Sequence, residues 1–183
     1  MNLLFILFFP FVAGLVLLIM KPAKAFIWSF AASLIELVAT GYVLSEMAGS
    51  ATSQSYLHEW IPEVGISFSL LADGISGILI GLCALLVPFI VATTAKTEKA
   101  NNAQYQGLIL TMQTALMGAF LAKDAFLFYF FFEASLLPIY FLASLYGGEN
   151  RQAISFKFLS TSVSNSSLSE GVSSIKTSWP PKS

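Results

Sequence analysis

Long apolar runs alternate with short polar segments along most of the chain. Five runs are about as long as the roughly 20 residues that a helix needs to cross a bilayer. The predicted spans are Leu3–Met20, Ala25–Leu44, Gly74–Thr93, Gln106–Ala122 and Asp124–Tyr146. The pattern therefore predicts an all-α integral membrane protein with about five transmembrane helices.

The loop Met47–Ala72 has a different pattern. Tyr56–Ile61 and Ile66–Leu70 flank a segment with Pro62 and Gly65, and the second run alternates apolar and polar residues. This alternation is typical of a half-buried strand. We predict a small extracytoplasmic β-hairpin over the helix ends, followed by Asp73 as the N-cap of the third helix.

Composition supports the membrane prediction and narrows the chemistry. Of the 183 residues, 56% are hydrophobic and 10% are charged, whereas a soluble domain has about 25% charged residues. The single cysteine, Cys83, excludes an internal disulfide, and there is no basic patch for nucleic acid. Nucleotide-binding and metal-ligand motifs are absent too, so we expect no cofactor in this chain.

Basic residues predict the orientation. Lys21 and Lys24 follow the first span, Lys96 and Lys99 follow the third, and Arg151 follows the fifth. Because cytoplasmic loops are enriched in lysine and arginine, these loops are expected inside and the N-terminus outside. Lys123, after the fourth span, is the single exception.

The chain changes character after Phe158. The segment 159–183 is rich in serine and shows neither a helical nor a strand period, which is typical of disorder. We therefore expect a membrane domain over 1–158 and a disordered tail over 159–183. The abrupt change favours a frameshifted or truncated reading frame.

Glu133 is the main candidate for chemistry. It lies nine positions into the fifth span, about 14 Å deep in a hydrocarbon core about 30 Å thick. Intramembrane acids are rare and usually functional, which predicts a proton carrier, although a hydrogen-bonded acid that ties helices together is the plain alternative. Pro138 follows five positions later and is a candidate hinge.

Glu36 is a second intramembrane acid, in the second span, and is either a proton relay or a structural group. Thr111, Gln113 and Thr114 in the fourth span are polar as well. We expect these three side chains to hydrogen-bond between helices rather than to line a hydrated path.

Several blocks of the sequence resemble a known family, the antiporter-like subunit M of bacterial NADH-quinone oxidoreductase (respiratory complex I). The resemblance covers about 1–158. The blocks are Phe120–Asp124, Phe126–Glu133, Leu137–Leu142, Trp60–Pro62, Gly65–Ser67, Asp73–Ser76, Gly147–Arg151 and Lys157–Phe158.

This resemblance implies a proton-pumping membrane subunit, with Glu133 at the family's essential glutamate, which pairs with a lysine of a later helix. It implies electron transfer from NADH to quinone in partner subunits, which hold the flavin and iron–sulfur clusters. It also implies a bacterial inner-membrane location, other membrane subunits as partners, and the lipid bilayer and protons as further contacts.

Two alternatives share these features. Subunits of multisubunit cation/proton antiporters and membrane-bound hydrogenases carry a similar glutamate motif. The matching blocks stop after Phe158 and the lysine helix is missing, so a non-functional membrane fragment is the third reading.

Overall fold

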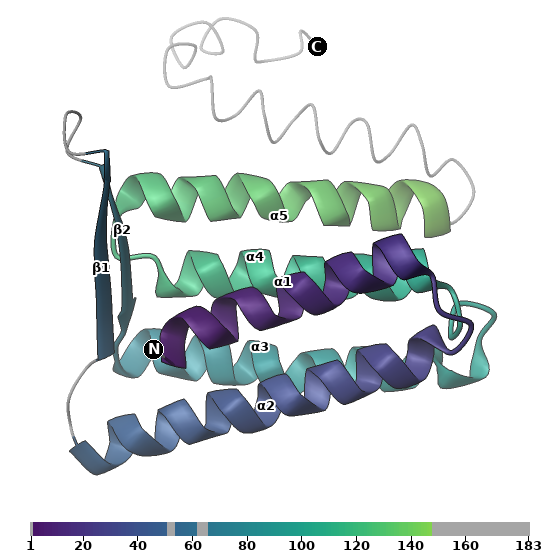
Figure 1. The fold of residues 1–183 in the computed structure, drawn as a ribbon, viewed down its shortest axis with the longest axis horizontal. Coiled ribbons are helices and arrows are strands. Elements are labelled where there is room, and N and C mark those ends of the chain that lie inside the picture. The colour runs from purple at the N-terminus through teal and green to yellow at the C-terminus, as the bar shows by residue number, and fades with distance from the viewer. Residues whose placement is uncertain (1, 51–53, 62–65, 148–183) are drawn as a thin grey trace, which may run out of the picture. The chain divides into compact units, whose positions relative to one another are not determined.

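The computed structural model describes residues 2–50, 54–61 and 66–147, and it divides the chain into the units Met1–Ile139 and Tyr140–Ser183. In the second unit, the described residues are the last turns of helix α5 and Gly147. Figure 1 shows the elements. They are α1 (Asn2–Met20), α2 (Ala25–Ser50), β1 (Gln54–Ile61), β2 (Ile66–Ala72), α3 (Gly74–Thr93), the short 3-10 helix η2 (Thr94–Lys96), α4 (Ala103–Leu121) and α5 (Ala125–Tyr146).

Four of the described helices are long and apolar enough to cross a membrane. The exception is α4, which has 19 residues but carries Gln106, Gln113 and two threonines. It packs against α1, α2 and α3, and 12 of its residues are buried. Since the polar helix is enclosed by apolar ones, the fold is that of the predicted multi-pass membrane protein.

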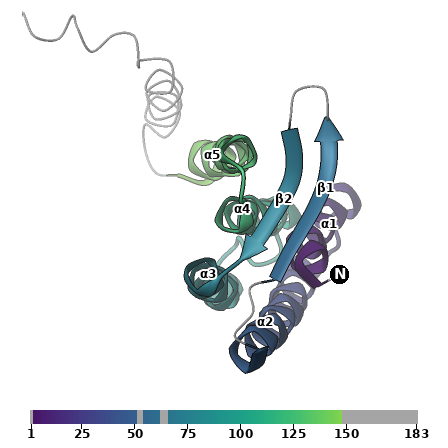
Figure 2. The same cartoon turned by 90° about the vertical axis from the view of Figure 1, so that its left-hand side faces the viewer.

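The predicted hairpin is confirmed. Strands β1 and β2 pair antiparallel, from Gln54 opposite Ala72 to Ile61 opposite Ile66, and lie across one end of the helices (Figure 2). Leu70 of β2 is fully buried in an apolar core with residues of all five helices. The Lys123 amide also donates to the Ser69 carbonyl at 2.9 Å. The hairpin therefore joins the α4–α5 connection to the bundle.

Two helices are longer than the sequence pattern predicts. Helix α2 continues to Ser50, so the predicted loop Met47–Ala72 begins inside it. Helix α4 begins at Ala103 rather than at Gln106, because Asn102 caps it by accepting a hydrogen bond from the Tyr105 amide at 3.1 Å. In both cases polar residues continue a helix beyond its apolar run.

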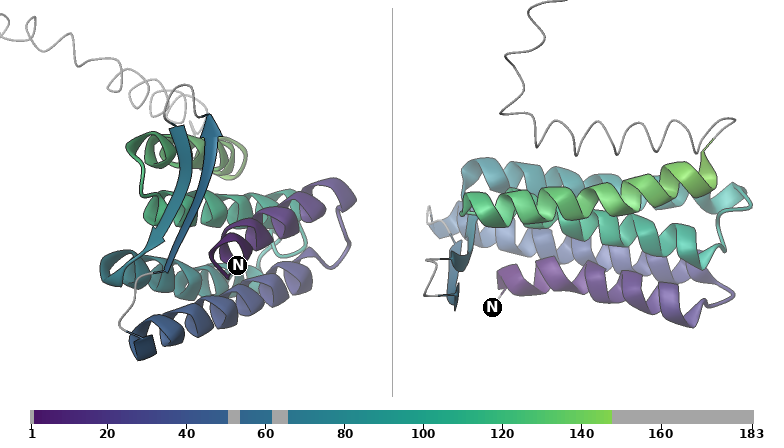
Figure 3. Two further views of the ribbon diagram at one scale, coloured as in Figure 1. Left: turned by 60° about the vertical axis from the view of Figure 1, so that its left-hand side comes forward. Right: turned by 90° about the horizontal axis from the view of Figure 1, so that it is seen from above.

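The lysine-bearing connections lie together at one end of the bundle. Figure 3 shows the α1–α2 and α3–α4 connections at the end opposite the hairpin. The first connection carries Lys21 and Lys24, and the second carries Lys96 and Lys99. Lys123 lies at the hairpin end. Four of the five lysines in the described part of the chain thus lie at one end of the bundle, which is the asymmetry expected of a membrane protein.

Asp73 caps α3 as predicted. Its carboxylate accepts from the amides of Ile75 at 3.1 Å and Ser76 at 2.8 Å, and the Ser76 hydroxyl accepts from the Asp73 amide at 2.8 Å. The hydrogen bonds from Ser76 lower the pKa of Asp73, because they stabilise its charged form. This cap therefore stabilises the junction between β2 and α3 above the ordinary pKa of aspartate, and the contribution is lost as the pH falls through the lowered value.

A glycine contact sets the approach of α1 to α4. A Cβ on Gly14 would lie 2.9 Å from the Gly107 carbonyl oxygen, and a Cβ on Gly107 would lie 2.9 Å from the Gly14 carbonyl oxygen. Small residues at such crossings allow two membrane helices to approach closely. The backbone itself forms this contact, so a methyl group cannot be accommodated by a side-chain rotation.

Replacing either glycine by alanine should therefore destabilise the bundle. We expect Gly14→Ala and Gly107→Ala to lower the free energy of unfolding by about 1–3 kcal/mol through overpacking. Gly41→Ala is the matched control, since nothing lies within 4 Å of a Cβ there, and it should be neutral or stabilising by up to about 1 kcal/mol. Unfolding of the full chain in mixed micelles by increasing SDS measures the difference. Equal stability of all three variants would contradict the contact.

Candidate functional site

Glu133 lies in the middle of α5 and is half-buried. Its side chain makes no hydrogen bond or ion pair with any other residue that the structure describes. The nearest lysine in the sequence, Lys123, lies about three helical turns away at the hairpin end. A carboxyl group at this depth without a partner among the described residues is costly, so its side chain requires a neighbour or water.

Two side chains on a different face of α5 from Glu133 contact the rest of the bundle. Leu127 is buried in the apolar core, and Phe131 packs onto α4 at Gly118, where a Cβ would overlap the aromatic ring. Phe128 and Phe132 stack at 6.1 Å and are exposed. The missing side chain at Gly118 thus leaves room for the Phe131 ring, through which α5 contacts α4.

Pro138 is buried within α5, and the helix continues through it to Tyr146. In this conformation the helix is therefore unbroken at the predicted hinge. Proline removes one backbone hydrogen bond from such a helix, which leaves it easier to bend at this point.

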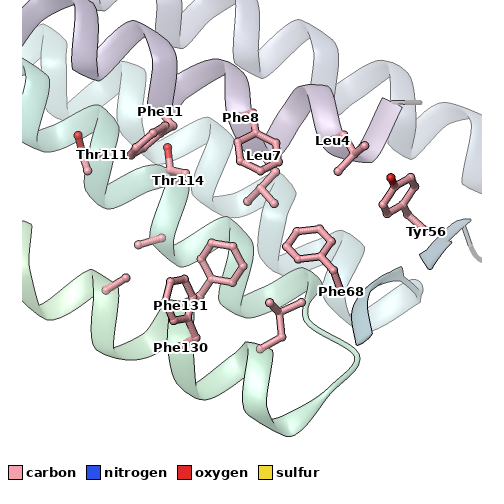
Figure 4. Close-up of a pocket in the computed structure, with 13 residues that line it drawn as sticks. Leu4, Leu7, Phe8, Phe11, Tyr56, Phe68, Thr111, Thr114, Phe130 and Phe131 are labelled. Atoms are coloured by element: carbon pink, nitrogen blue, oxygen red, sulfur yellow. The ribbon is translucent and has the colours of Figure 1, made fainter. Parts of the chain in front are cut away.

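A cavity of about 670 Å³ opens between α1, the hairpin, α4 and α5. Figure 4 shows that Phe8 and Phe11 of α1 and Phe130 and Phe131 of α5 line it. Tyr56, Thr111 and Thr114 are its polar lining residues. The hydroxyls of the two threonines donate to the carbonyls of Gly107 at 2.9 Å and Leu110 at 3.1 Å in their own helix. The cavity is therefore mostly apolar, and the expectation that these threonines hydrogen-bond between helices is wrong.

Glu36 is fully buried in α2. One carboxyl oxygen accepts from the Thr40 hydroxyl at a long 3.5 Å, and the other has no hydrogen-bond partner within the described part of the chain. Gln113 of α4 is also fully buried, and neither atom of its amide has a described partner. The two intramembrane acids are separate features, because Glu36 lies inside the bundle and Glu133 on its outer helix.

The interhelical hydrogen bonds are made by residues that the sequence reading missed. Ser29 of α2 donates to the Gln106 side-chain oxygen at 3.1 Å, and the Gln106 amide donates to the Thr94 hydroxyl at 2.8 Å. A signal was available, since Gln106 and Gln113 are seven positions apart and so share one face of a helix. Among the described residues, no group of three His, Cys, Asp or Glu side chains is placed to hold a metal ion.

No family model matches the sequence. Over 133 residues the chain is 38% identical to F(420)H(2) dehydrogenase subunit M of Methanosarcina mazei, covering 72% of this chain and 27% of that protein. Over 128 residues it is 31% identical to NADH-quinone oxidoreductase subunit M of Rickettsia felis, covering 69% of this chain and 26% of that protein. The chain thus spans about a quarter of the length of these relatives.

Solved structures show the same fold. A chain of respiratory complex I from Thermus thermophilus superposes with a TM-score of 0.79 at 25% identity, covering 91% of this chain and 33% of that one. A chain of the Mrp complex from Dietzia sp. superposes with a TM-score of 0.70 at 18% identity, covering 90% of this chain and 18% of that one. In sequence and in fold, this chain is a multi-pass membrane relative of subunit M, an antiporter-like subunit of complex I-type oxidoreductases.

Proposed function

We propose that the chain forms part of the membrane arm of a proton-translocating NADH-quinone oxidoreductase, with Glu133 as its proton carrier. Two of its relatives are named as subunit M of an F(420)H(2) dehydrogenase and subunit M of an NADH-quinone oxidoreductase. In this proposal, electron transfer from NADH to quinone takes place in partner subunits, and the chain itself carries no redox group. Its part is to move protons in response to that reaction.

The position of Glu133 is the observation that carries the proposal. An acid in the middle of a membrane helix, half-buried and without a partner in the described chain, is placed to meet a group from elsewhere. Burial favours the neutral form of a carboxyl group and a nearby cation favours its charged form. A cation that approaches and withdraws would therefore make Glu133 release and bind a proton.

The counter-charge comes from outside the described residues in this proposal. The described lysines lie in the connections at the two ends of the bundle, so none is at the depth of Glu133. A lysine of another helix or subunit, packed over the Glu133 side of α5, would complete the pair. Pro138, one turn beyond Glu133, would let the helix bend as the pair forms and separates.

The proposed orientation places the N-terminus and the hairpin outside a bacterial inner membrane. The two connections with paired lysines then face the cytoplasm, in agreement with the distribution of positive charge in membrane proteins. Lys123 at the hairpin end is one basic residue against four at the other end of the described bundle.

A cation/proton antiporter subunit is the second candidate. The fold likeness to the Mrp complex favours it, and the same acid would then exchange its proton against a cation gradient. The two functions differ in the driving force: NADH oxidation drives the first, and an imposed sodium gradient drives the second.

Replacing Glu133 by glutamine should stop proton translocation without preventing assembly. Glutamine has nearly the same shape but cannot carry a proton, and loss of a proton-transfer group typically costs about 100-fold or more in rate. The measurement is NADH-driven acidification in membrane vesicles that contain the assembled complex, with quinone reduction as the measure of assembly.

Glu98→Gln is the matched control, since Glu98 is an exposed acid in the α3–α4 connection, and it should translocate protons normally. Normal translocation by Glu133→Gln would overturn the role of Glu133. Failure of the native chain to co-purify with other membrane subunits would overturn the proposed function as a whole.

Cysteine labelling tests the orientation. Ser55 in β1 and Ala95 in η2 are exposed at opposite ends of the bundle, whereas the native Cys83 is buried. A membrane-impermeant maleimide added to intact cells should label Ser55→Cys but label Ala95→Cys only after the membrane is opened. The reverse pattern would show that the N-terminus is inside.

A further inference from the structure

A line of buried polar side chains runs along one face of α2. Ser29, Ser33, Glu36 and Thr40 are spaced by three or four positions, so they share one face of the helix. All four are buried with at most 1% of their surface exposed. Burying apolar side chains on this face would cost less free energy in a membrane protein, so the line of polar side chains needs an explanation.

Helix α4 contributes the facing polar groups. The hydrogen bond from Ser29 to Gln106 joins the two helices near the lysine-bearing end. Both helices begin at that end, so they run in the same direction (Figure 1). Seven residues further along each helix, about 10 Å deeper, come Glu36 on α2 and Gln113 on α4. The contact between Ser29 and Gln106 therefore places these two side chains at the same level.

Helix α3 packs against both α2 and α4 at this level. Met117, one turn beyond Gln113, clusters with Cys83 and Ala84 of α3, and Leu37 of α2 packs against this cluster. Glu36 lies within electrostatic range of the Cys83 thiol. Cys83 is the titratable group that α3 presents here, while α1 has none and that of α4 is Tyr105 in its first turn. Ion pairing thus does not stabilise Glu36 within the described chain.

Three polar atoms at this level have no described partner: one oxygen of Glu36 and both amide atoms of Gln113. An unsatisfied polar atom in an apolar interior costs about 1–3 kcal/mol. Buried water molecules typically make about three hydrogen bonds to such atoms. The number and kind of unpaired groups, one carboxyl oxygen and one amide donor–acceptor pair, match what one bridging water can bind.

We propose that Glu36 and Gln113 form an internal water-binding site in which the Glu36 carboxyl group exchanges its proton with bound water. In this exchange the carboxyl O–H bond breaks as the proton passes to water, and the O–H bond of the carboxyl group re-forms when water returns a proton. Ser33 and Ser29 lie between the site and the lysine-bearing end, and the Ser33 hydroxyl donates to the Phe30 carbonyl of its own helix at 2.9 Å. The site would supply protons for the translocation proposed above, but it exists or fails independently of that function.

Infrared spectroscopy of the full chain in lipid vesicles tests the site. The difference between the spectra of the native chain and Glu36→Gln isolates the carboxylic acid absorption of Glu36. On transfer to heavy water this band should shift within minutes, because bound water carries deuterium to the carboxyl group. Gln113→Leu, which removes the amide, should slow the shift by about tenfold, on the order of the loss of one hydrogen bond.

Two further variants separate the site from a general effect on folding. Thr40→Val removes the one described donor to Glu36 and should move the carbonyl band to higher frequency. Thr111→Val is the control, since its hydroxyl binds its own helix, and it should leave both band and exchange unchanged. A Glu36 band that resists exchange for hours, or that is absent, would overturn the proposal. Loss of translocation in Glu133→Gln has no bearing on this result.

Discussion

A polar group inside a bilayer must find its partners within the protein, and this constraint organises the bundle. Among the described residues, helix α4 carries both buried amide side chains, Gln106 and Gln113, and it packs against α1, α2 and α3. The outer faces of the other helices expose large apolar side chains such as Phe5, Val38 and Ile78. This arrangement, with polar groups inside and apolar groups outside, is the reverse of that in a soluble domain. It follows from the free-energy cost of exposing a polar atom to hydrocarbon.

The same constraint explains why small residues matter here. In lipid, apolar side chains gain little by associating, so helices are held by close packing and hydrogen bonds. Gly14 and Gly107 bring α1 to α4, and Gly118 brings Phe131 of α5 to α4. The hairpin then fixes one end through Leu70 and the Ser69 carbonyl. Leu127 and Phe131 join α5, the helix that carries Glu133, to the rest of the bundle.

The sequence alone predicted the helices, the hairpin and the Asp73 cap, because each depends on local signals: apolar length, alternation and a capping side chain. It could not predict which polar residues meet. Thr111 and Thr114 were expected to hydrogen-bond between helices, but each hydroxyl donates to the backbone carbonyl one turn earlier in its own helix. Gln106 has a longer side chain that reaches Ser29 and Thr94. The hydrogen-bond partner of each polar side chain depends on the rotation and separation of the helices. These are set by the packing of the whole bundle.

Glu133 is the proposed proton carrier, and its side chain has no partner among the described residues, so what surrounds this side chain in the complex is the central question. Cysteine accessibility in the assembled complex measures them directly. A small, water-soluble thiol reagent should modify Glu133→Cys but not Phe132→Cys, because Phe132 stacks on Phe128 in an exposed aromatic surface of α5 that we expect to face lipid. Modification of both positions only by a lipid-soluble reagent would show that Glu133 faces hydrocarbon, which would contradict its role in carrying protons.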